Sequence, residues 1–344
     1  MRQIRVLVVE DSMVFRELLV QALNKDPAIT VVATAKDPFE ARDAILTYKP
    51  DVMTLDIELP KMSGLEFLKK LMPQYPLPVV VISSLSDKVF DAMNAGAVDF
   101  VAKPQMTDKQ QLSVLLNNEL PIKIKIASTA RIGNIKSSLS APAKRNTVVK
   151  KDGVSLVAIG ASTGGTEAIT TVIKEFGPDI PGTVIVQHMP AGFTEMFSNR
   201  LNDVCRVNVK EAKNGDKIVQ GQVLVAPGGD AQMRVKRVGE DLQVEIKKGP
   251  KVNGHCPSVD VLFDSVATVA EDSAIGIILT GMGGDGAKGL LSMRKAGAVT
   301  IGQDESTCVV YGMPKVAYDI GAVQYQDKLT DIAKRTYSIL GKSK

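Results

Sequence analysis

The sequence lacks tryptophan, and its 344 residues include only three cysteines and two histidines. The cysteines are far apart and form no CxxC pair, which argues against a disulfide framework or a structural zinc site and favours a reducing compartment. No apolar run approaches the roughly 20 residues that a membrane span requires. No small-residue cleavage site follows the first apolar run, so we expect neither an export signal nor membrane insertion. The sequence therefore predicts a cytoplasmic protein.

The net charge of +4 is concentrated in one segment. Eight basic residues and no acidic ones lie between positions 120 and 151, and the rest of the chain has 34 basic and 38 acidic residues. Because this segment is also rich in Ser, Ala and Pro, we interpret 123–151 as a flexible linker, with a phosphate- or membrane-binding arm as the alternative. The linker would separate domains 1–122 and 152–344, and no folded nucleic-acid-binding face is expected.

The first domain alternates short apolar runs with segments of helical periodicity. The run 4–9 (IRVLVV) is typical of a strand buried on both faces. Four further runs follow, with helical segments between them, so the pattern predicts an α/β fold of five βα units. Such folds collect functional residues at the carboxyl ends of their parallel strands.

Ionisable residues stand at four of those strand ends. Glu10 and Asp11 close the first predicted strand, Asp56 the third, Ser83 the fourth and Lys103 the fifth. Three converging carboxylates repel one another unless a cation neutralises them, and a site of oxygen ligands suits Mg²⁺. Asp56 could then accept a phosphoryl group as an acyl phosphate, which the Ser83 hydroxyl could hydrogen-bond.

The motifs VVEDS, LDIELPKMSGLEFL, VISS and KP resemble the receiver domain of two-component response regulators, which has a flavodoxin-like (βα)5 fold. The resemblance implies that Asp56 is the phosphoacceptor and that Glu10 and Asp11, with Asp56, bind Mg²⁺. It also implies that Ser83 and Lys103 sense the phosphoryl group, and that Phe100 fills the aromatic switch position. The phosphodonor of such a domain would be a histidine kinase.

The second domain begins with an apolar run that enters the glycine-rich sequence GASTGG. Ser162 lies at this predicted strand-to-helix turn, where a serine is exposed and close to backbone N–H groups. The same N–H groups could instead cradle a phosphate. The loop alone does not decide between a nucleophile and an anion site.

His188 and Asp285 follow two other predicted strands, TVIVQ and AIGIILT. Serine, histidine and aspartate at the ends of parallel strands could meet at one edge of the sheet. In such a trio the imidazole takes the serine proton and the carboxylate orients the imidazole. A lone histidine is nevertheless more often structural than catalytic.

A dinucleotide site is a rival interpretation of the same region. Gly281, Gly283 and Gly286 fit GxGxxG after a strand, and Asp304 ends the next strand, where a ribose-binding acid would lie. That pattern would suit a dinucleotide-dependent oxidoreductase. A non-catalytic, phospho-regulated binding module is a third possibility.

The motifs IGASTGGTEAI, QHMP, NGHCPSVDVLF, ILTGMGGDGAKG and STCVVYGMPK resemble the catalytic domain of the CheB methylesterases, from about residue 154 to near the C-terminus. The resemblance implies a doubly wound, mainly parallel α/β domain with Ser162 as nucleophile, His188 as general base and acid, and Asp285 as the orienting carboxylate. Backbone N–H groups near Thr163 or Met282 would stabilise the oxyanion. Gln232 departs from a histidine that is frequent in the family after APGG. His255 lies in a shared motif, and its role is not derivable from spacing.

The implied reaction is hydrolysis of glutamate methyl esters on the cytoplasmic helices of methyl-accepting chemoreceptors, with release of methanol. Deamidation of glutamine would pass through a similar tetrahedral intermediate. Hydrolysis itself would need no cofactor, whereas phosphorylation of the receiver would need Mg²⁺. Phosphorylation is expected to regulate the hydrolase.

Overall fold

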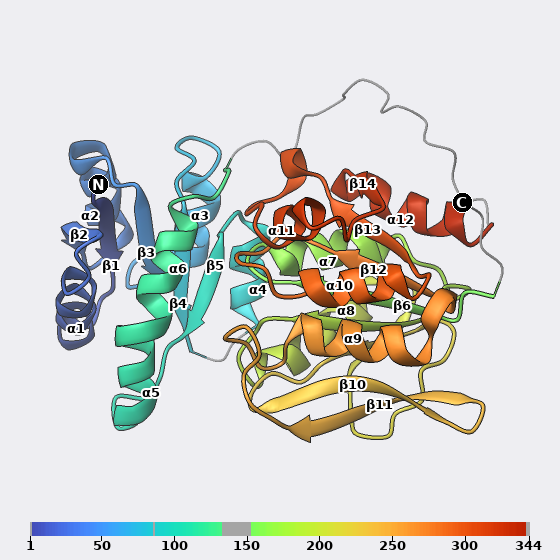
Figure 1. The fold of residues 1–344 in the computed structure, drawn as a ribbon. Coiled ribbons are helices and arrows are strands. Elements are labelled where there is room, and N and C mark those ends of the chain that lie inside the picture. Colours follow the sequence, from blue (N-terminus) through green and yellow to red (C-terminus); the bar gives the residue numbers. More distant parts are fainter. Residues whose placement is uncertain (1, 85–86, 133–152, 342–344) are drawn as a thin grey trace. The chain divides into compact units, whose positions relative to one another are not determined.

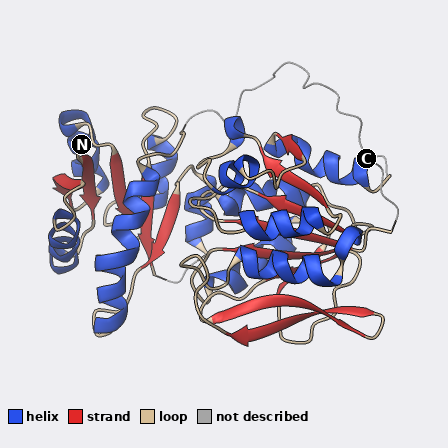
Figure 2. Ribbon diagram, in the orientation of Figure 1, coloured by secondary structure: helices blue, strands red, loops and turns tan. Residues whose placement is uncertain are grey.

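The computed structural model describes residues 2–84, 87–132 and 153–341. The chain forms two compact units, Met1–Gly133 and Asn134–Lys344. Figure 1 follows the chain through both units, and Figure 2 shows that each one combines strands with flanking helices. The two units are described separately below.

The first unit is a five-stranded parallel sheet with the order β2-β1-β3-β4-β5. Its strands are β1 (Ile4–Val9), β2 (Ile29–Ala35), β3 (Val52–Asp56), β4 (Val79–Ser83) and β5 (Asp99–Ala102). Its helical segments are α1 (Met13–Asn24), α2 (Pro38–Tyr48), α3 (Gly64–Leu71), α4 (Lys88–Asn94), α5 (Lys109–Val114), a π-helical turn (Leu115–Glu119) and α6 (Leu120–Ala127). The predicted flavodoxin-like (βα)5 fold is confirmed.

Helix α6 corrects the predicted start of the linker. Leu120, Ile124 and Ala127 recur at helical spacing, and all three are fully buried. Lys123 is also held, because its Nζ donates to Asp99 Oδ1 (2.6 Å) and to the Phe100 carbonyl (2.7 Å). Residues 123–127 therefore belong to a packed helix of the first unit. Most of the predicted linker, 133–151, and the predicted start of the second domain at residue 152 lie outside the described residues.

The second unit is built on a seven-stranded sheet in which every pairing is parallel, with the order β14-β13-β12-β6-β7-β9-β8. Its strands are β6 (Leu156–Ala161), β7 (Gly182–Gln187), β8 (Asn208–Glu211), β9 (Gln222–Val225), β12 (Ala274–Ile278), β13 (Val299–Gln303) and β14 (Tyr325–Asp327). Strands β10 (Ala231–Val238) and β11 (Asp241–Lys248) form a separate antiparallel hairpin. The predicted doubly wound, mainly parallel domain is confirmed.

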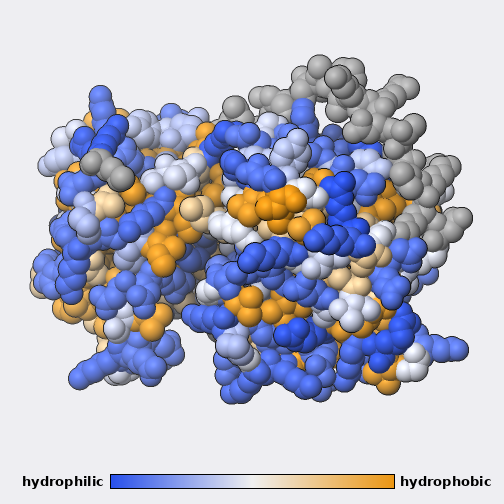
Figure 3. All heavy atoms as spheres, in the orientation of Figure 1, coloured by the Kyte–Doolittle hydropathy of each residue, from blue (hydrophilic) through white to orange (hydrophobic). Residues whose placement is uncertain are grey.

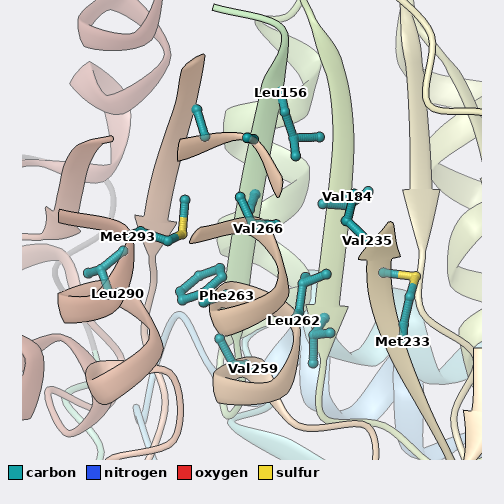
Figure 4. Packing of buried hydrophobic residues seen from close by; sticks show 14 of the residues in the cluster. Leu156, Val184, Met233, Val235, Val259, Leu262, Phe263, Val266, Leu290 and Met293 are labelled. Atoms are coloured by element: carbon teal, nitrogen blue, oxygen red, sulfur yellow. The ribbon is translucent and has the colours of Figure 1, made fainter. Parts of the chain in front are cut away.

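Helices cover both faces of this sheet (Figure 1). They are α7 (Gly165–Lys174), α8 (Phe193–Val204), α9 (Val259–Val269), α10 (Ala287–Lys295), α11 (Met313–Asp319) and α12 (Leu329–Ile339), with single 3-10 turns at Glu271–Ser273 and Glu305–Thr307. Figure 4 shows the core on the α9 side, where Leu262 of α9 lies on the side of the β10 residue Val235 and Phe263 lies on the side of Leu290 and Met293 of α10. Burial of this apolar surface fixes the height of α9 above the sheet.

On the face seen in Figure 3, hydrophobic residues form small patches among polar ones. Within the described residues, no helix is long and apolar enough to span a membrane.

Sheet order gives both units the same architectural feature. In each sheet, two neighbouring strands are followed by connections that run in opposite directions: β1 and β3 in the first unit, and β6 and β12 in the second. The carboxyl ends of strands at such a switch point leave room for a ligand between the diverging connections. Glu10, Asp11 and Asp56 lie at the first switch point, and Ser162 and Asp285 lie at the second. The other predicted site residues lie on or after neighbouring strands: Ser83, Phe100, Lys103 and His188.

Candidate active site and acidic site

Ser162 directly follows β6, the central strand of the seven-stranded sheet. Its backbone N–H donates to the Thr280 carbonyl (3.0 Å), and the chain turns through Gly164, at φ 76°, into helix α7. A Cβ on Gly281 would lie 2.7 Å from the Ser162 Cβ, so only glycine allows these two loops to approach so closely. The serine is therefore held at the point where the loops after β6 and β12 meet.

His188 follows β7, the neighbour of β6, and its backbone N–H donates to the Ala161 carbonyl (3.1 Å). The imidazole is mostly buried, with 8% of the side chain exposed, and its Nε2 lies 2.8 Å from Asp285 Oδ2. Its Nδ1 is buried and has no hydrogen-bond partner in the described part of the chain. One ring nitrogen is thus engaged by a carboxylate and the other is available.

Asp285 lies in the loop between β12 and α10 and receives five hydrogen bonds. Its Oδ2 accepts from His188 Nε2 and the Val259 N–H (2.7 Å), and its Oδ1 accepts from Asn253 Nδ2 (2.8 Å), Ser258 Oγ (2.7 Å) and the Asp260 N–H (3.3 Å). Burial acts to raise the pKa of Asp285, but the hydrogen bonds from His188 and the other donors outweigh it and hold the pKa well below its ordinary value.

An ionised carboxylate can only accept hydrogen bonds. His188 Nε2 must therefore carry the proton that it shares with Asp285, which leaves the lone pair of the neutral ring on Nδ1. In the serine proteases the carboxylate bonds the Nδ1 atom of the histidine and Nε2 acts as the base. Here the two nitrogens exchange these roles, because Asp285 bonds Nε2. The geometry provides a buried imidazole whose basic nitrogen is unoccupied and whose opposite nitrogen is anchored.

The sequence analysis missed the role of the turn at Asn253 and Gly254. Both residues have positive φ values, 53° and 85°, and the flanking residues Val252 and His255 exchange two backbone hydrogen bonds of 2.9 Å. Asn-Gly is the preferred pair for such a two-residue turn, so the sequence Asn253-Gly254 could have predicted a turn here. The Asn253 amide donates both of its protons, one to Asp285 and one to Asp260 Oδ2 (2.7 Å).

The same turn brings the second histidine onto the first. The rings of His188 and His255 are stacked, with centroids 3.7 Å apart and planes at 7°. Sequence spacing could not reveal this contact, because it depends on where the turn lies relative to β7.

Gln232 lies beneath the turn and is 4% exposed. Its Nε2 donates to the carbonyls of Pro250 (2.9 Å) and His255 (3.4 Å), and its Oε1 accepts the Ser258 N–H (2.8 Å). This departure from the family pattern therefore supports the turn and the first residues of α9 from within the protein.

The loops that carry Thr163 and Met282 adjoin each other. Thr163 is buried, its carbonyl accepts a hydrogen bond from Thr280 Oγ1 (3.0 Å), and Met282 follows the glycine that packs on Ser162. Met282 itself is 46% exposed. Both backbones thus lie beside the serine, as the interpretation of an oxyanion site requires.

The glycines of the GMGGDG loop have packing roles. A Cβ on Gly281 would collide with Met313 and Ser162, and one on Gly286 would lie 2.5 Å from a Val259 methyl carbon. Asp304 accepts hydrogen bonds from the backbone N–H and hydroxyl of Ser306. The contacts of Gly281 and Gly286, together with the positive φ of Gly283 (84°), account for the GxGxxG pattern, and the dinucleotide interpretation has no support.

In the first unit, the predicted acidic residues do converge. Glu10, Asp11 and Asp56 offer carboxylate oxygens that all lie within 4.8 Å of one another. Lys103 Nζ donates to both Glu10 oxygens (3.0 and 2.9 Å) and to Asp56 Oδ2. The pKa of Glu10 is raised to about 7. Burial is the main cause and the charge of Asp56 adds to it, although the hydrogen bond from Lys103 acts to lower the pKa. The oxygen-only donor set and this residual negative charge fit a magnesium ion.

Ser83 lies next to this acidic site through Lys103, and Phe100 lies in β5, three residues before Lys103. Ser83 ends β4, is 1% exposed, and its carbonyl accepts the Lys103 N–H (2.7 Å). Phe100 in β5 is buried, with its ring edge-on to Phe90 at 6.4 Å. The carboxyl ends of four parallel strands, β1, β3, β4 and β5, thus bring together Glu10, Asp11, Asp56, Ser83 and Lys103.

Comparison with known proteins gives matches in both units. The CheB methylesterase family model matches residues 157–336, and the response regulator receiver domain matches residues 6–116. A protein-glutamate methylesterase/protein-glutamine glutaminase 2 of Syntrophomonas wolfei is 60% identical over 99% of this chain and 98% of its own length. The corresponding protein of Salmonella choleraesuis is 44% identical over 99% and 97%.

Among solved structures, the CheB methylesterase catalytic domain of Thermotoga maritima is 34% identical to this chain, with a TM-score of 0.53. The match covers 54% of this chain and 98% of that domain.

Proposed function

Because this chain belongs to the CheB methylesterase family and carries a response regulator receiver domain, we propose that it hydrolyses glutamate methyl esters on methyl-accepting chemoreceptors. Ser162 is the nucleophile, His188 the general base and acid, and Asp285 the orienting carboxylate. The observation that carries this proposal is the anchored imidazole, with Nε2 on Asp285 and a buried Nδ1 that has no protein partner among the described residues.

In this mechanism, His188 Nδ1 takes the proton of Ser162 as the serine oxygen attacks the ester carbonyl. The carboxylate of Asp285 stabilises the imidazolium that forms and keeps Nε2 protonated throughout. His188 then gives its proton to the departing methoxide, and methanol leaves. A water molecule, deprotonated by His188, then attacks the acyl-serine. His188 gives that proton to the departing Ser162 oxygen, and the products are free glutamate and the original serine.

The oxyanion would be stabilised by the backbone N–H groups near Thr163 and Met282. Both residues belong to loops that are held against Ser162. A single donor of this kind typically changes the rate by 10²–10³-fold. Because an amide carbonyl forms a similar tetrahedral intermediate, the same groups would also support deamidation of glutamine, releasing ammonia.

The receiver domain would regulate this hydrolase through phosphorylation of Asp56 by a chemotaxis histidine kinase. Glu10, Asp11 and Asp56 would hold Mg²⁺, which would neutralise the charge of the incoming phosphoryl group. Lys103 lies within reach of Asp56, and Ser83 lies beside Lys103, so both could contact an added phosphoryl group. Phe100 would respond as the aromatic switch residue.

The proposal is tested by methanol release from methyl-esterified chemoreceptor membranes, with and without acetyl phosphate and Mg²⁺. We expect release to increase on phosphorylation and to fall about 10³-fold or more in Ser162→Ala. Asp56→Asn should keep the unstimulated rate and lose the increase. Near wild-type release by Ser162→Ala would refute the serine mechanism, and no release by the wild type from any receptor would favour a non-catalytic receptor-binding module.

A further inference from the structure

His255 stacks on His188, but neither the proposed mechanism nor the sequence analysis gives it a chemical role. We propose that His255 is a positioning residue for the reaction: its ring fixes the plane of His188 and stabilises the imidazolium that His188 becomes. This inference rests on the proposed ester hydrolysis and adds a residue to it.

The stack is unusually close for two aromatic rings. Pairs of neutral rings favour offset or edge-on arrangements with centroids about 4.5–7 Å apart, because their quadrupoles repel in a face-to-face sandwich. His188 and His255 instead have centroids 3.7 Å apart and nearly parallel planes. That separation is close to the van der Waals distance of carbon atoms, about 3.5–4.0 Å, so the rings overlap with little lateral offset.

The backbone holds His255 in this position. Its N–H and carbonyl groups both bond to Val252 across the two-residue turn, and its carbonyl also accepts from Gln232 Nε2. Gln232 is itself fixed by Ser258 at the start of α9. Because the same turn presents Asn253 to Asp285, one short hairpin positions the carboxylate and covers one face of the imidazole.

Face-to-face stacking becomes favourable when one of the two rings carries a positive charge. A cation over the face of an aromatic ring, within about 6 Å of its centroid, is attracted by the negative potential of that face. His188 is neutral before the reaction and carries a positive charge once it has taken the proton of Ser162. The stack is therefore stronger in the transition state than in the ground state, which is the condition for raising kcat.

The stack also directs the edge of the ring. Asp285 bonds His188 at Nε2 only. Because Nε2 lies close to the axis of the Cβ–Cγ bond, the ring can still rotate about that bond without losing this hydrogen bond. Contact with the flat face of His255 limits this rotation and leaves the in-plane lone pair of His188 Nδ1 accessible. Nδ1 is thereby kept in one direction, and misplacement of a catalytic atom by about 1 Å can cost 10²-fold in rate.

The test compares three substitutions of His255 in the full-length chain by receptor methanol release under phosphorylating conditions. Phe retains a flat aromatic face without a titratable nitrogen, Leu fills much of the space without an aromatic face, and Ala leaves it empty. We expect kcat to fall about tenfold in His255→Leu and His255→Ala, and no more than about threefold in His255→Phe. KM should stay within about twofold of wild type in all three.

Lys251→Ala, an exposed position on the same hairpin, is the matched control and should retain wild-type kcat. Thermal unfolding identifies any variant that does not fold, and the Phe and Leu pair decides the question even if Ala fails. The inference is overturned if Leu is as active as Phe, if all three variants match wild type, or if the loss appears in KM and not in kcat. Failure of the wild type and of Lys251→Ala to release methanol would instead refute the proposed function.

Discussion

Two carboxylate sites, one in each unit, occupy the same kind of place in their sheets. Glu10 and Asp56 lie after β1 and β3, and Asp285 follows β12 beside β6, in each case at a switch point of a parallel sheet. Their surroundings differ. In the first site three carboxylates lie close together and one lysine bonds two of them, whereas five donors surround the carboxylate of Asp285 in the second. The pKa of Glu10 is raised by burial to about 7, whereas the pKa of Asp285 is held low by its donors in spite of burial.

The comparison shows that burial alone does not decide the charge of a carboxylate. Glu10 is fully buried and Asp285 nearly so, yet their pKa values move in opposite directions. At Glu10, burial and the charge of Asp56 outweigh Lys103, whereas at Asp285 the interactions with His188, Asn253 and Ser258 outweigh burial. A site short of positive charge is suited to receive a cation. A site saturated with neutral donors holds a permanent negative charge, which is what an imidazole needs beside it during proton transfer.

Removing the permanent charge should have the largest effect. Asp285→Asn cannot stabilise the imidazolium, and its amide would favour the wrong tautomer of His188, so we expect kcat to fall about 10⁴-fold. Receptor methanol release measures the loss. Asp264→Asn, which changes an exposed aspartate of α9, is the control. A loss of less than tenfold in Asp285→Asn would mean that the carboxylate does not act in catalysis.

Removing the single lysine of the acidic site tests the opposite case. Lys103→Met leaves Glu10 and Asp56 without their shared cation, and we expect the free energy of unfolding to fall by about 2 kcal/mol, since the lysine is one-quarter exposed. Millimolar Mg²⁺ should restore part of the loss by binding the folded state. Calorimetric unfolding provides the measurement, and Lys69→Met, at an exposed position of helix α3, is the control. An unchanged transition, or no response to Mg²⁺, would contradict this account.

Removing one donor from Asp285 should have a smaller effect. Asn253→Ala takes a hydrogen bond from each of Asp285 and Asp260, so we expect a loss of about 1–2 kcal/mol at pH 7 and about tenfold in kcat. The folded-state pKa of Asp285 is depressed, so its stabilising contribution is present above the unfolded value, about 3.9, and is lost as pH falls through the folded-state pKa.

In Asn253→Ala the folded-state pKa of Asp285 should rise, so this loss should be smaller and should end at a higher pH than in the wild type. Urea unfolding between pH 7 and pH 3 compares the two proteins. Parallel stability curves across this range would show that the amide does not support the charge of Asp285.

The smallest effect is expected for the residue that departs from the family pattern. Gln232→His restores the frequent residue, and a neutral imidazole still offers one donor and one acceptor to the turn. We expect kcat and KM to remain within about threefold of wild type. A larger change confined to KM would indicate that this position contacts the substrate.

Much of the fold could be predicted because buried parallel strands have short, continuous apolar sequences. The apolar runs at 4–9, 156–159 and 274–280 predict strands in this way, and the structure has strands at 4–9, 156–161 and 274–278. The order of such runs along the chain predicts two α/β sheets. The predicted linker starts too early because basic residues such as Lys123 and Lys125 suggest an exposed segment. Ile124 lies between them and is buried, and residues 120–127 form helix α6.

The candidate site was predictable only at the level of strand ends. Ser162, His188 and Asp285 could be selected because each follows an apolar run. The ring nitrogen that Asp285 engages depends on the orientation of the His188 side chain, and the stack depends on the position of a distant turn, so neither has a signature in residue spacing. The Asn-Gly pair predicted a turn, but not what the turn would touch.

The seven-stranded sheet also determines the width of the active site, because the strand spacing is fixed. Hydrogen-bonded strands lie about 4.8 Å apart, so the three adjacent strands β12, β6 and β7 set the width of the site at about 10 Å whatever connects them. Chain length between the residues is correspondingly unconstrained: 97 positions separate His188 from Asp285. An insertion at the exposed tip of the β10–β11 hairpin, at residues 239–240, therefore lengthens the connection without altering that width, which makes this tip a natural attachment point for a reporter domain.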